Sequence, residues 1–337
     1  MKSKIQVAIV LSVVTVFAEK GPGVQEAQSL AVPPDLIDPS WLGDRAQGQY
    51  EAAAAFEVYC DFAFSDQIAQ SGISFRNRIV DDSGKAYIPV HYDHGNGLSV
   101  ADVDGDGLID LYFPNQVGGN QLWKNLGDGR FVDITSEALA LDRSIDVAAS
   151  FADIDNDGDP DLYVTAVRSG NHLFANDGKG GFEDISAESG LDYKGHSSGA
   201  VFFDYNRDGL LDLFLANVGI YTSEDRVPVS RGLSEPNTEV EYEYYPGLKD
   251  AFFGHLKPER AERSLLYENI DGRRFVEVSE KRGLVDRGWS GDACPLDANE
   301  DGWPDLYVLN MQGDDEYYQN AGGEYFIRKS RPLFPAT

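Results

Sequence analysis

The chain has 337 residues, 42% of them hydrophobic, and can therefore bury a sizeable core in one large domain or two smaller ones. Its formal net charge of −29 argues against nucleic acid as a partner, because phosphate binding needs a basic surface, and makes cations its natural complement. The 35 glycines and the 12% of aromatic residues are typical of many turns and many short strands.

The N-terminal segment has the pattern of an export signal. Lys2 and Lys4 precede an apolar run over residues 5–17, and a cleavage site fits near Ala18. We therefore expect a signal peptide at residues 1–18, a partly helical extension at residues 19–63, and a mature protein that is secreted, periplasmic or held in the cell envelope. The alternative is a membrane-anchored N-terminus. The run is short for a bilayer, however, and no later segment has the length of a transmembrane helix.

The cysteines do not form a disulfide framework, since the chain has only Cys60 and Cys294. In an oxidising compartment these two could form one bond. Two separate buried thiols are the alternative, and the sequence does not decide between them.

Four acidic segments repeat one pattern, D-x-[DN]-x-D-G-x-x-D-L. Their first aspartates, Asp102, Asp153, Asp204 and Asp297, are 51, 51 and 93 residues apart, which indicates a repeat architecture. Positions 1, 3, 5 and 9 carry side-chain oxygens in every copy. These residues are Asp102, Asp104, Asp106 and Asp110; Asp153, Asp155, Asp157 and Asp161; Asp204, Asn206, Asp208 and Asp212; and Asp297, Asn299, Asp301 and Asp305.

This spacing predicts calcium loops. Position 6 is always glycine, which allows a sharp turn, and position 7 varies (Leu108, Asp159, Leu210 and Trp303), as expected where only a backbone carbonyl binds the ion. Hard oxygen ligands without histidine or cysteine favour Ca²⁺ over zinc. The alternative is that aspartate, asparagine and glycine simply form turns, which four copies in register make improbable. We expect about four Ca²⁺ ions, one in each loop.

The residues around each acidic segment predict strands. In the second copy, "AASFA" precedes the loop and "PDLYVTAV", "NHLFAN" and "FEDIS" follow it, separated by turns rich in Gly, Asp and Asn. Four short strands in about fifty residues form one blade of a β-propeller. We therefore expect an all-β fold over residues 64–337, with four-stranded blades at about 95–140, 146–191, 197–284 and 289–330.

Two segments depart from the regular repeat. The third blade is interrupted by a loop over residues 219–263, and its several tyrosines predict that it folds over a face of the blades. Residues 64–73, "FSDQIAQSGI", match the outer fourth strand of later blades, although no first three strands precede them. This orphan outer strand would belong to a blade that the chain does not contain.

The repeats resemble FG-GAP/VCBS repeats, the calcium-loop blades also found in integrin α-chain propellers. Stretches such as "NQLWKNLGDGRFVDIT" and "NHLFANDGKGGFEDIS" are most similar to the cartilage-acidic-protein (ASPIC/UnbV) type of exported proteins. The resemblance implies a propeller of about seven blades followed by a further domain. This chain shows four blades, the orphan strand and an end at "FPAT". We therefore expect a propeller that is open or truncated relative to a seven-bladed ring, with a closed ring of four or five blades as the alternative.

Two classes of function fit this sequence. The first is an exported binding or adhesion module that recognises an extracellular or cell-envelope protein or glycan, with calcium in a structural role. The second is an exported enzyme or metal-dependent accessory protein with a site on the propeller face opposite the calcium loops. No GxSxG elbow, P-loop or CxxCH haem site is present, so we favour binding over catalysis.

The position of a ligand site follows from strand length. A strand of about six residues spans roughly 20 Å, so the residues before each first strand lie on the face opposite the acidic loops. In register these are His94, Ile145, His196 and Trp289. We predict that His94, His196 and Trp289, with His91 and Asp93, form a recognition or metal site. The alternative is that the two histidines only hydrogen-bond their own glycine-rich turns.

Overall fold

The computed structural model describes residues 47–48, 51, 65–80, 92, 96–228, 242–249, 257–311 and 314–330. The chain divides into two compact units, residues 1–65 and residues 66–337. In the first unit, Gln47 and Gly48 are helical, and the Gln47 Nε2 atom donates a hydrogen bond to Glu51 Oε1. The predicted signal peptide and most of the predicted extension lie outside the described residues.

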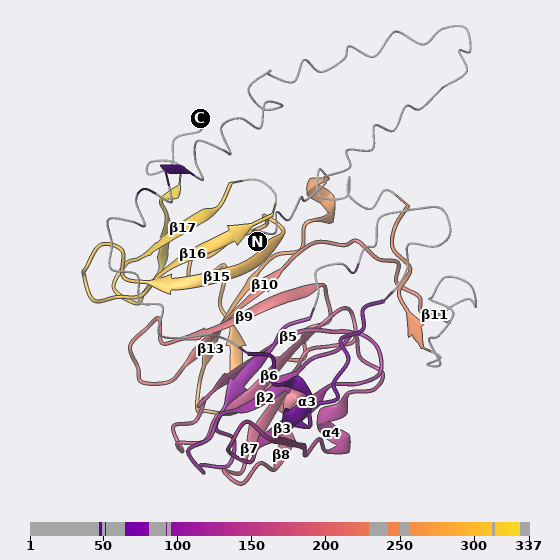
Figure 1. Ribbon diagram of the computed structural model, residues 1–337. Helices are drawn as coiled ribbons and strands as arrows, with labels where there is room; N and C mark the ends of the chain where they lie inside the picture. The colour runs from indigo at the N-terminus through magenta and orange to yellow at the C-terminus, as the bar shows by residue number, and fades with distance from the viewer. Residues whose placement is uncertain are drawn as a thin grey trace, which may run out of the picture. The chain divides into compact units, whose positions relative to one another are not determined.

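The second unit contains four four-stranded antiparallel sheets, each one blade (Figure 1). Within each blade the strands pair in chain order, from the first to the fourth. The strands are β1 (Ser99–Ala101), β2 (Asp110–Phe113), β3 (Gln121–Asn125) and β4 (Phe131–Asp133); β5 (Asp146–Ala152), β6 (Asp161–Ala166), β7 (His172–Asn176) and β8 (Phe182–Asp184); β9 (Ser197–Phe203), β10 (Asp212–Asn217), β13 (Leu265–Asn269) and β14 (Phe275–Glu277); and β15 (Ser290–Leu296), β16 (Asp305–Asn310), β17 (Glu316–Asn320) and β18 (Phe326–Arg328).

The blades are joined through their first strands, since β1 packs beside β5, β5 beside β9, and β9 beside β15. Hydrogen bonds cross each of these joints. Gly97 N donates to Val147 O at 2.8 Å, Ser150 Oγ donates to Ala200 O at 2.7 Å, and Ser198 Oγ donates to Ser290 O at 2.7 Å. In Figure 1 the strands of the first two blades overlap in the lower part of the view, and the third blade lies between them and the yellow last blade.

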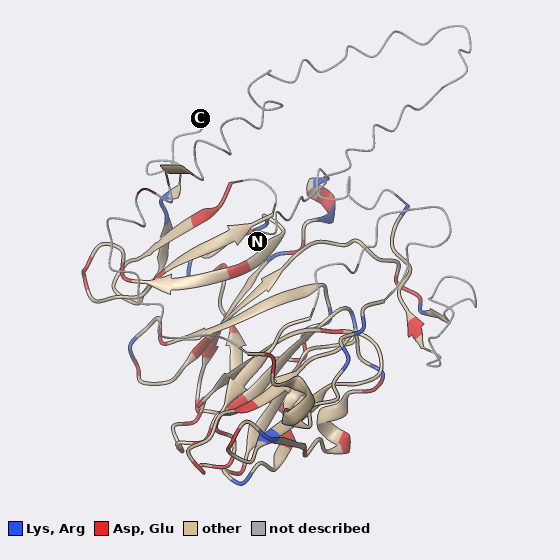
Figure 2. Cartoon of the chain, in the orientation of Figure 1, with Lys and Arg blue, Asp and Glu red and all other residues tan. Residues whose placement is uncertain are grey.

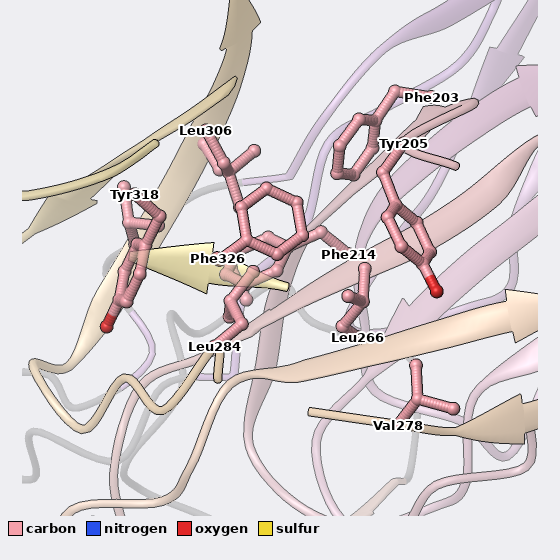
Figure 3. Close-up of a cluster of buried hydrophobic side chains, with 12 residues drawn as sticks. Phe203, Tyr205, Phe214, Leu266, Val278, Leu284, Leu306, Tyr318 and Phe326 are labelled. Carbon is pink, nitrogen blue, oxygen red and sulfur yellow. The ribbon is translucent and has the colours of Figure 1, made fainter. Parts of the chain in front are cut away.

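Apolar side chains fill the space between neighbouring blades. Figure 3 shows one such cluster, where Phe203 and Phe214 from the third blade lie near Leu306 and Phe326 from the fourth. The interleaving explains why all six residues of β6 and all six of β10 are buried, because a blade lies on each side of them. In β16 of the last blade, by contrast, Leu309 is 45% exposed.

This burial gradient, together with the four stacked sheets, describes an open or partial propeller, as the sequence predicted. Among the described residues the sheets form no closed barrel. The end blades therefore expose apolar surface that the two middle blades bury, including Val100 on β1 and Leu309 on β16.

The predicted orphan outer strand is not assigned as a strand in the described residues, since residues 65–67 have no regular secondary structure. The segment instead forms the short helix α3 (Ile68–Ser71), followed by Gly72 in the left-handed conformation. The second blade has the same feature after its outer strand, with helix α5 (Ser186–Ser189) and left-handed Gly190. A Cβ atom on Gly72 would lie 3.0 Å from Phe131 O of β4, and one on Gly190 would lie 3.2 Å from Phe275 O of β14. Helix α3 thus occupies the place against the first blade that a preceding blade's helix would fill.

The insertion in the third blade is folded where it is described. It contains a two-stranded sheet of β11 (Val227–Pro228) and β12 (Glu243–Tyr244), and the 3₁₀ helix η3 (Pro258–Arg260). Tyr221 and Tyr244 are buried in a cluster with Trp289 and Val167 from the blades. Helix α4 (Glu137–Ala140), after β4, completes the described elements.

The cysteines do not both lie in the described residues. Cys294 is a free and exposed thiol on β15, whereas Cys60 lies outside the described residues. The alternative of two buried thiols is therefore wrong for Cys294, whose side chain faces outward from an edge strand.

Candidate functional site

The four acidic loops occupy the same place in every blade, between the first and second strands. Asp102 follows β1 and Asp110 begins β2, and the same relation holds for Asp153, Asp204 and Asp297 in the other blades. All four loops therefore lie at one end of the strands. Acidic residues, red in Figure 2, recur in the loops between strands.

Hydrogen bonds inside each loop hold it in shape without an ion. The carboxylate at position 1 accepts a bond from the glycine N–H at position 6, at 2.7–3.0 Å in all four copies. The carboxylate at position 5 accepts from the N–H at position 7, at 2.9 Å in each copy. In three of the loops the other oxygen of position 1 accepts a further bond, from the N–H at position 5, at 3.1 Å.

Two backbone positions of each loop are left-handed. The glycine at position 6 was expected, and its φ lies between 84° and 97° in the four copies. Position 4 is left-handed as well, although it is Gly105, Asn156, Arg207 and Glu300 in turn. Glycine and asparagine adopt this conformation easily, whereas arginine and glutamate are held there at a cost by the rest of the loop.

The aspartate at position 9 is bound twice by the blade. In the second blade Asp161 Oδ2 accepts a bond from Ile154 N at 3.0 Å, and Asp161 Oδ1 accepts one from Asn176 N at 2.9 Å. The same pair of bonds is present in the other three blades. Position 9 therefore fixes the loop to the third strand and also offers oxygens to an ion.

A recurring asparagine that the sequence argument missed completes this network. Each third strand ends in asparagine: Asn125, Asn176, Asn269 and Asn320. The Nδ2 atoms of the last three donate to a carbonyl in the acidic loop of the preceding blade, namely Val103, Ile154 and Tyr205, at 2.8–3.0 Å. The signal was the final "N" of "NHLFAN", "SLLYEN" and "DEYYQN", which recurs as regularly as the aspartates.

The first two loops have the ligand set that a hard divalent cation needs. Carboxylate oxygens of Asp102, Asp104 and Asp110 lie within 4.8 Å of one another, as do those of Asp153, Asp155 and Asp161. Asp104 Oδ1 and Asp153 Oδ1 are buried and have no hydrogen-bond partner. Buried oxygens that no donor satisfies are costly, and a cation would satisfy them. The residues present therefore fit calcium.

Burial acts against the charge of these carboxylates when no cation is bound. Burial is the largest cause that raises the pKa of Asp161 to about 6 and that of Asp212 to about 8; nearby loop carboxylates contribute to the increase, and backbone hydrogen bonds oppose it. The pKa of Asp110 is raised by burial in the same way. A divalent cation would reverse the effect, because it stabilises the ionised form.

The loops are not identical in their details. In the third and fourth, Asn206 and Asn299 donate from Nδ2 to Asp208 and Asp301, at 2.9 and 2.8 Å, and so reduce repulsion between acidic groups. In the first loop, Lys124 from β3 forms ion pairs with Asp104 and, at 3.0 Å, with Asp106. Among the described residues, the second loop has neither of these devices.

The predicted ligand-face residues lie at the other end of the strands. Strand β9 separates His196 from Asp204, and β15 separates Trp289 from Asp297. His196 is fully buried: its Nδ1 atom lies 2.7 Å from Glu262 Oε1 and its Nε2 atom 2.8 Å from Thr222 Oγ1. Burial lowers the pKa of His196, although Glu262 opposes this shift.

Trp289 is also buried, in the cluster beneath the insertion. His196 and Trp289 thus pack the base on which the insertion rests. His91, Asp93 and His94 lie outside the described residues, so their positions relative to His196 and Trp289 stay a prediction.

A cavity of about 690 Å³ opens at this same end of the blades. Its walls come from the segment before β1, from the loop between β2 and β3, from the segment between α4 and β5, and from the insertion. Three arginines, Arg78, Arg143 and Arg226, line it together with Asp142 and Glu243. This is an unusual density of positive charge for a chain with 28 basic and 57 acidic residues.

Arg226 is held in place within the cavity. Its Nη1 donates to Arg143 O at 2.8 Å, its Nη2 donates to Ser169 Oγ at 2.9 Å, and its guanidinium carbon lies 4.9 Å from the centre of the Tyr245 ring. A guanidinium fixed in this way is preorganised to bind a carboxylate.

The fold and the four acidic loops define a β-propeller-type protein built from FG-GAP-like repeats. The family model described as FG-GAP-like repeat matches residues 102–164 and again residues 153–215. The two matches overlap and cover the first three acidic loops, in agreement with the repeats that the sequence predicted.

Known proteins resemble part of the chain. It is similar to cartilage acidic protein 1 of Homo sapiens, with 26% identity over 185 residues, covering 50% of this chain and 27% of that protein. The protein of the same name from Mus musculus is 26% identical over 187 residues, covering 50% and 28%. The aligned part thus spans little more than a quarter of these relatives.

A solved structure also overlaps with the fold. The structure of an Agrocybe aegerita lectin that recognises non-reducing terminal N-acetylglucosamine aligns with a TM-score of 0.29 and 16% identity, covering 68% of this chain and 64% of that one. Separately, none of the helices in the described residues is long and apolar enough to cross a membrane.

Proposed function

We propose that the chain is an exported, calcium-stabilised propeller module that binds a partner at the strand ends opposite its acidic loops. The proposal rests on the difference between the two ends of the blade strands. One end repeats a single acidic turn four times, and the other has a cavity lined by residues from four separate segments of the chain.

Calcium has a structural role in this proposal. Each ion would connect the first and second strands of a blade through the ligands at positions 1 to 9. The position 9 aspartate is itself bonded to the third strand, so ion binding would strengthen three strands together. An exported protein meets calcium at millimolar concentration, and extracellular calcium sites bind at about 10⁻⁴–10⁻³ M.

The cavity is the proposed ligand site. Arg78 and Arg143 line it with the anchored Arg226, which favours a ligand bearing a carboxylate group, such as an acidic glycan or an acidic side chain of a protein. Asp142 and Glu243 line it as well and would restrict which anionic groups fit. Binding rather than catalysis is supported because the basic groups of the cavity are all arginines, which recognise anions but do not exchange protons near neutral pH.

The proposal can be tested with arrays of acidic and neutral glycans and of extracellular-matrix proteins, probed with calcium-loaded protein. We expect retention of carboxylate-bearing ligands, and at least tenfold weaker binding for Arg226→Ala, since charge-assisted hydrogen bonds contribute about 1.5–3 kcal/mol. Arg274→Ala is the matched control, because Arg274 is exposed on the turn between β13 and β14 at the acidic-loop end. Equal binding by wild type and Arg226→Ala would contradict the assignment of the cavity.

A further inference from the structure

The first acidic loop differs from the other three in one residue outside the loop itself. Lys124, the residue before the asparagine that ends β3, reaches into the loop. The corresponding residues of the other third strands are Ala175, Glu268 and Gln319. None of these is cationic.

The Lys124 ammonium group contacts two of the predicted calcium ligands. It pairs with Asp104 Oδ2, and its Nζ atom lies 3.0 Å from Asp106 Oδ2. The lysine side chain is 26% exposed, and the Asp104 side chain is 15% exposed. The pair is therefore partly shielded from solvent, where a charge interaction is stronger than on an open surface.

Glu268 shows that the position does not serve the third loop in the same way. Its Oε2 atom accepts hydrogen bonds from Tyr205 Oη at 2.6 Å and from Arg282 Nη2 at 2.6 Å. It is thus bound to side chains of the third blade rather than to the acidic ligands. The interaction of Lys124 with its loop is a property of the first blade.

We propose that Lys124 is a built-in cation that competes with calcium for the first loop. This inference rests on the proposed calcium binding. With Lys124 in place, the ammonium neutralises Asp104 and Asp106, and the loop is stable without an ion. When calcium enters, the lysine must leave these oxygens, and its positive charge disfavours a second cation a few ångströms away.

The acidic loops would therefore differ in their affinity for calcium. The first loop binds calcium most weakly and fills last, whereas the second loop, with a similar acidic triad and Ala175 in place of the lysine, binds more tightly. The four-carbon stem of lysine lets the ammonium swing to solvent, so the displacement needs no change in the backbone.

Reciprocal variants test the proposal by calcium titration calorimetry. Lys124→Ala should tighten the weakest site about tenfold, and Ala175→Lys should weaken the second loop by a similar factor, as expected for one unit charge near a dication. The double variant Lys124→Ala/Asp106→Ala should lose this increase in calcium affinity, which would show that the increase belongs to the first loop. Lys124→Gln, which keeps the length of the side chain, should reproduce the result of Lys124→Ala.

The melting temperature is a second test. Loss of an ordinary salt bridge would lower it both with and without calcium, whereas the proposal predicts opposite changes. Lys124→Ala should lower the melting temperature in excess chelator, because Asp104 and Asp106 then repel each other, yet raise it at subsaturating calcium. If Lys124→Ala and Lys124→Gln bind calcium with unchanged affinity while the other loops bind normally, the role of Lys124 is wrong and calcium binding stands. If no variant binds calcium at all, the proposed function itself fails.

Discussion

Single residues determine the backbone conformation of the acidic loops. The left-handed backbone at positions 4 and 6 is shared by all four turns. Only glycine adopts this conformation without cost, and it stands at position 6 in all four copies, with φ of 91° at Gly209. The loop is therefore specified by backbone freedom as much as by its acidic ligands.

Replacing one such glycine should isolate the backbone contribution. A Cβ atom on Gly209 would meet no atom within 4 Å, so Gly209→Ala adds no clash and imposes only a left-handed alanine. We expect a loss of about 1 kcal/mol in the free energy of unfolding, measured by urea denaturation. Gly291→Ala is the control, because Gly291 lies on β15 without a positive φ and its added Cβ would make only ordinary contacts. Equal effects of the two substitutions would show that the left-handed turn is not specified by its glycine.

Asp146 is a buried acid at the strand ends opposite the acidic loops. Its Oδ2 atom accepts a bond from Asn120 Nδ2 at 2.7 Å, and Ser144 Oγ donates to its Oδ1. Burial raises the pKa of Asp146 to about 7, and the two hydrogen bonds only partly oppose this. Because an unfolded aspartate has a pKa of about 3.9, the folded protein keeps a proton on Asp146 between about pH 4 and 7 that the unfolded chain has lost. The stability contribution of Asp146 therefore falls as the pH rises through this range.

Asp146→Asn should remove that pH dependence. The free energy of unfolding of the variant, relative to wild type, should increase by roughly 2–4 kcal/mol between pH 4 and pH 8. The measurement is urea unfolding at saturating calcium, which keeps the loop carboxylates ionised throughout. Asp146→Ser serves as a second variant, since serine occupies the same register at Ser197 and Ser290. A constant difference between variant and wild type across this range would contradict the buried acid.

At the scale of the blade, the asparagine that ends each third strand links neighbouring sheets. Asn176 Nδ2 donates to Val103 O of the first blade and to Pro160 O of its own blade, and its Oδ1 accepts from Gly178 N. Asn125, its counterpart in the first blade, bonds to Ile109 O and Gly127 N of its own blade. Among the described residues no blade precedes the first, so Asn125 lacks the bond across the joint and is also less buried than Asn176.

This difference provides a matched pair of substitutions. Asn176→Ala should lower the free energy of unfolding by about 2–3 kcal/mol, because buried backbone carbonyls lose their donor, whereas Asn125→Ala should cost about 1 kcal/mol. Thermal unfolding of the two variants would measure the difference. If Asn125→Ala lowers the free energy of unfolding as much as Asn176→Ala does, the bond across the joint contributes nothing to stability.

The repeated pattern made the elements and the acidic loops predictable from the sequence. Four copies of one ten-residue motif fix which residues turn and which begin a strand, because ligands, glycine and apolar residues recur at constant spacing. Position 4 of the loops was not predictable, since Gly105, Asn156, Arg207 and Glu300 share a conformation without sharing chemistry. The contact of Lys124 with the first loop was not predictable either, because Lys124 reaches this loop from another strand of the blade.

The opposite face was harder to predict, for a physical reason. Register places His196 and Trp289 at the correct end of the strands, but it says nothing about what covers them. The insertion supplies Thr222 and Glu262 as partners for His196 and buries Trp289 beside Tyr221 and Tyr244. Arg226, which lines the cavity, belongs to the insertion, where no repeat marks its position.

Across the whole molecule, acidic charge exceeds basic charge by a wide margin, and calcium would reduce it only in part. Four bound ions would change the formal charge from −29 to about −21. We therefore expect the calcium-loaded protein to bind strongly to an anion exchanger and to pass through a DNA column at physiological salt. DNA retention that persists in calcium would contradict the view that the arginines form a local site in an acidic surface.

The central claim is that cations hold the blades of this acidic molecule together, and calorimetric melting with and without calcium tests it most directly. A site held at a hundred times its dissociation constant adds about 2.7 kcal/mol of stability. Chelation with EDTA should therefore lower the melting temperature by several degrees, about 2–4 °C for each kcal/mol lost. Calcium should restore it, and magnesium should restore less, because it demands a tighter octahedral shell. An unchanged melting temperature in excess EDTA, with the bound calcium measured as zero, would contradict the account.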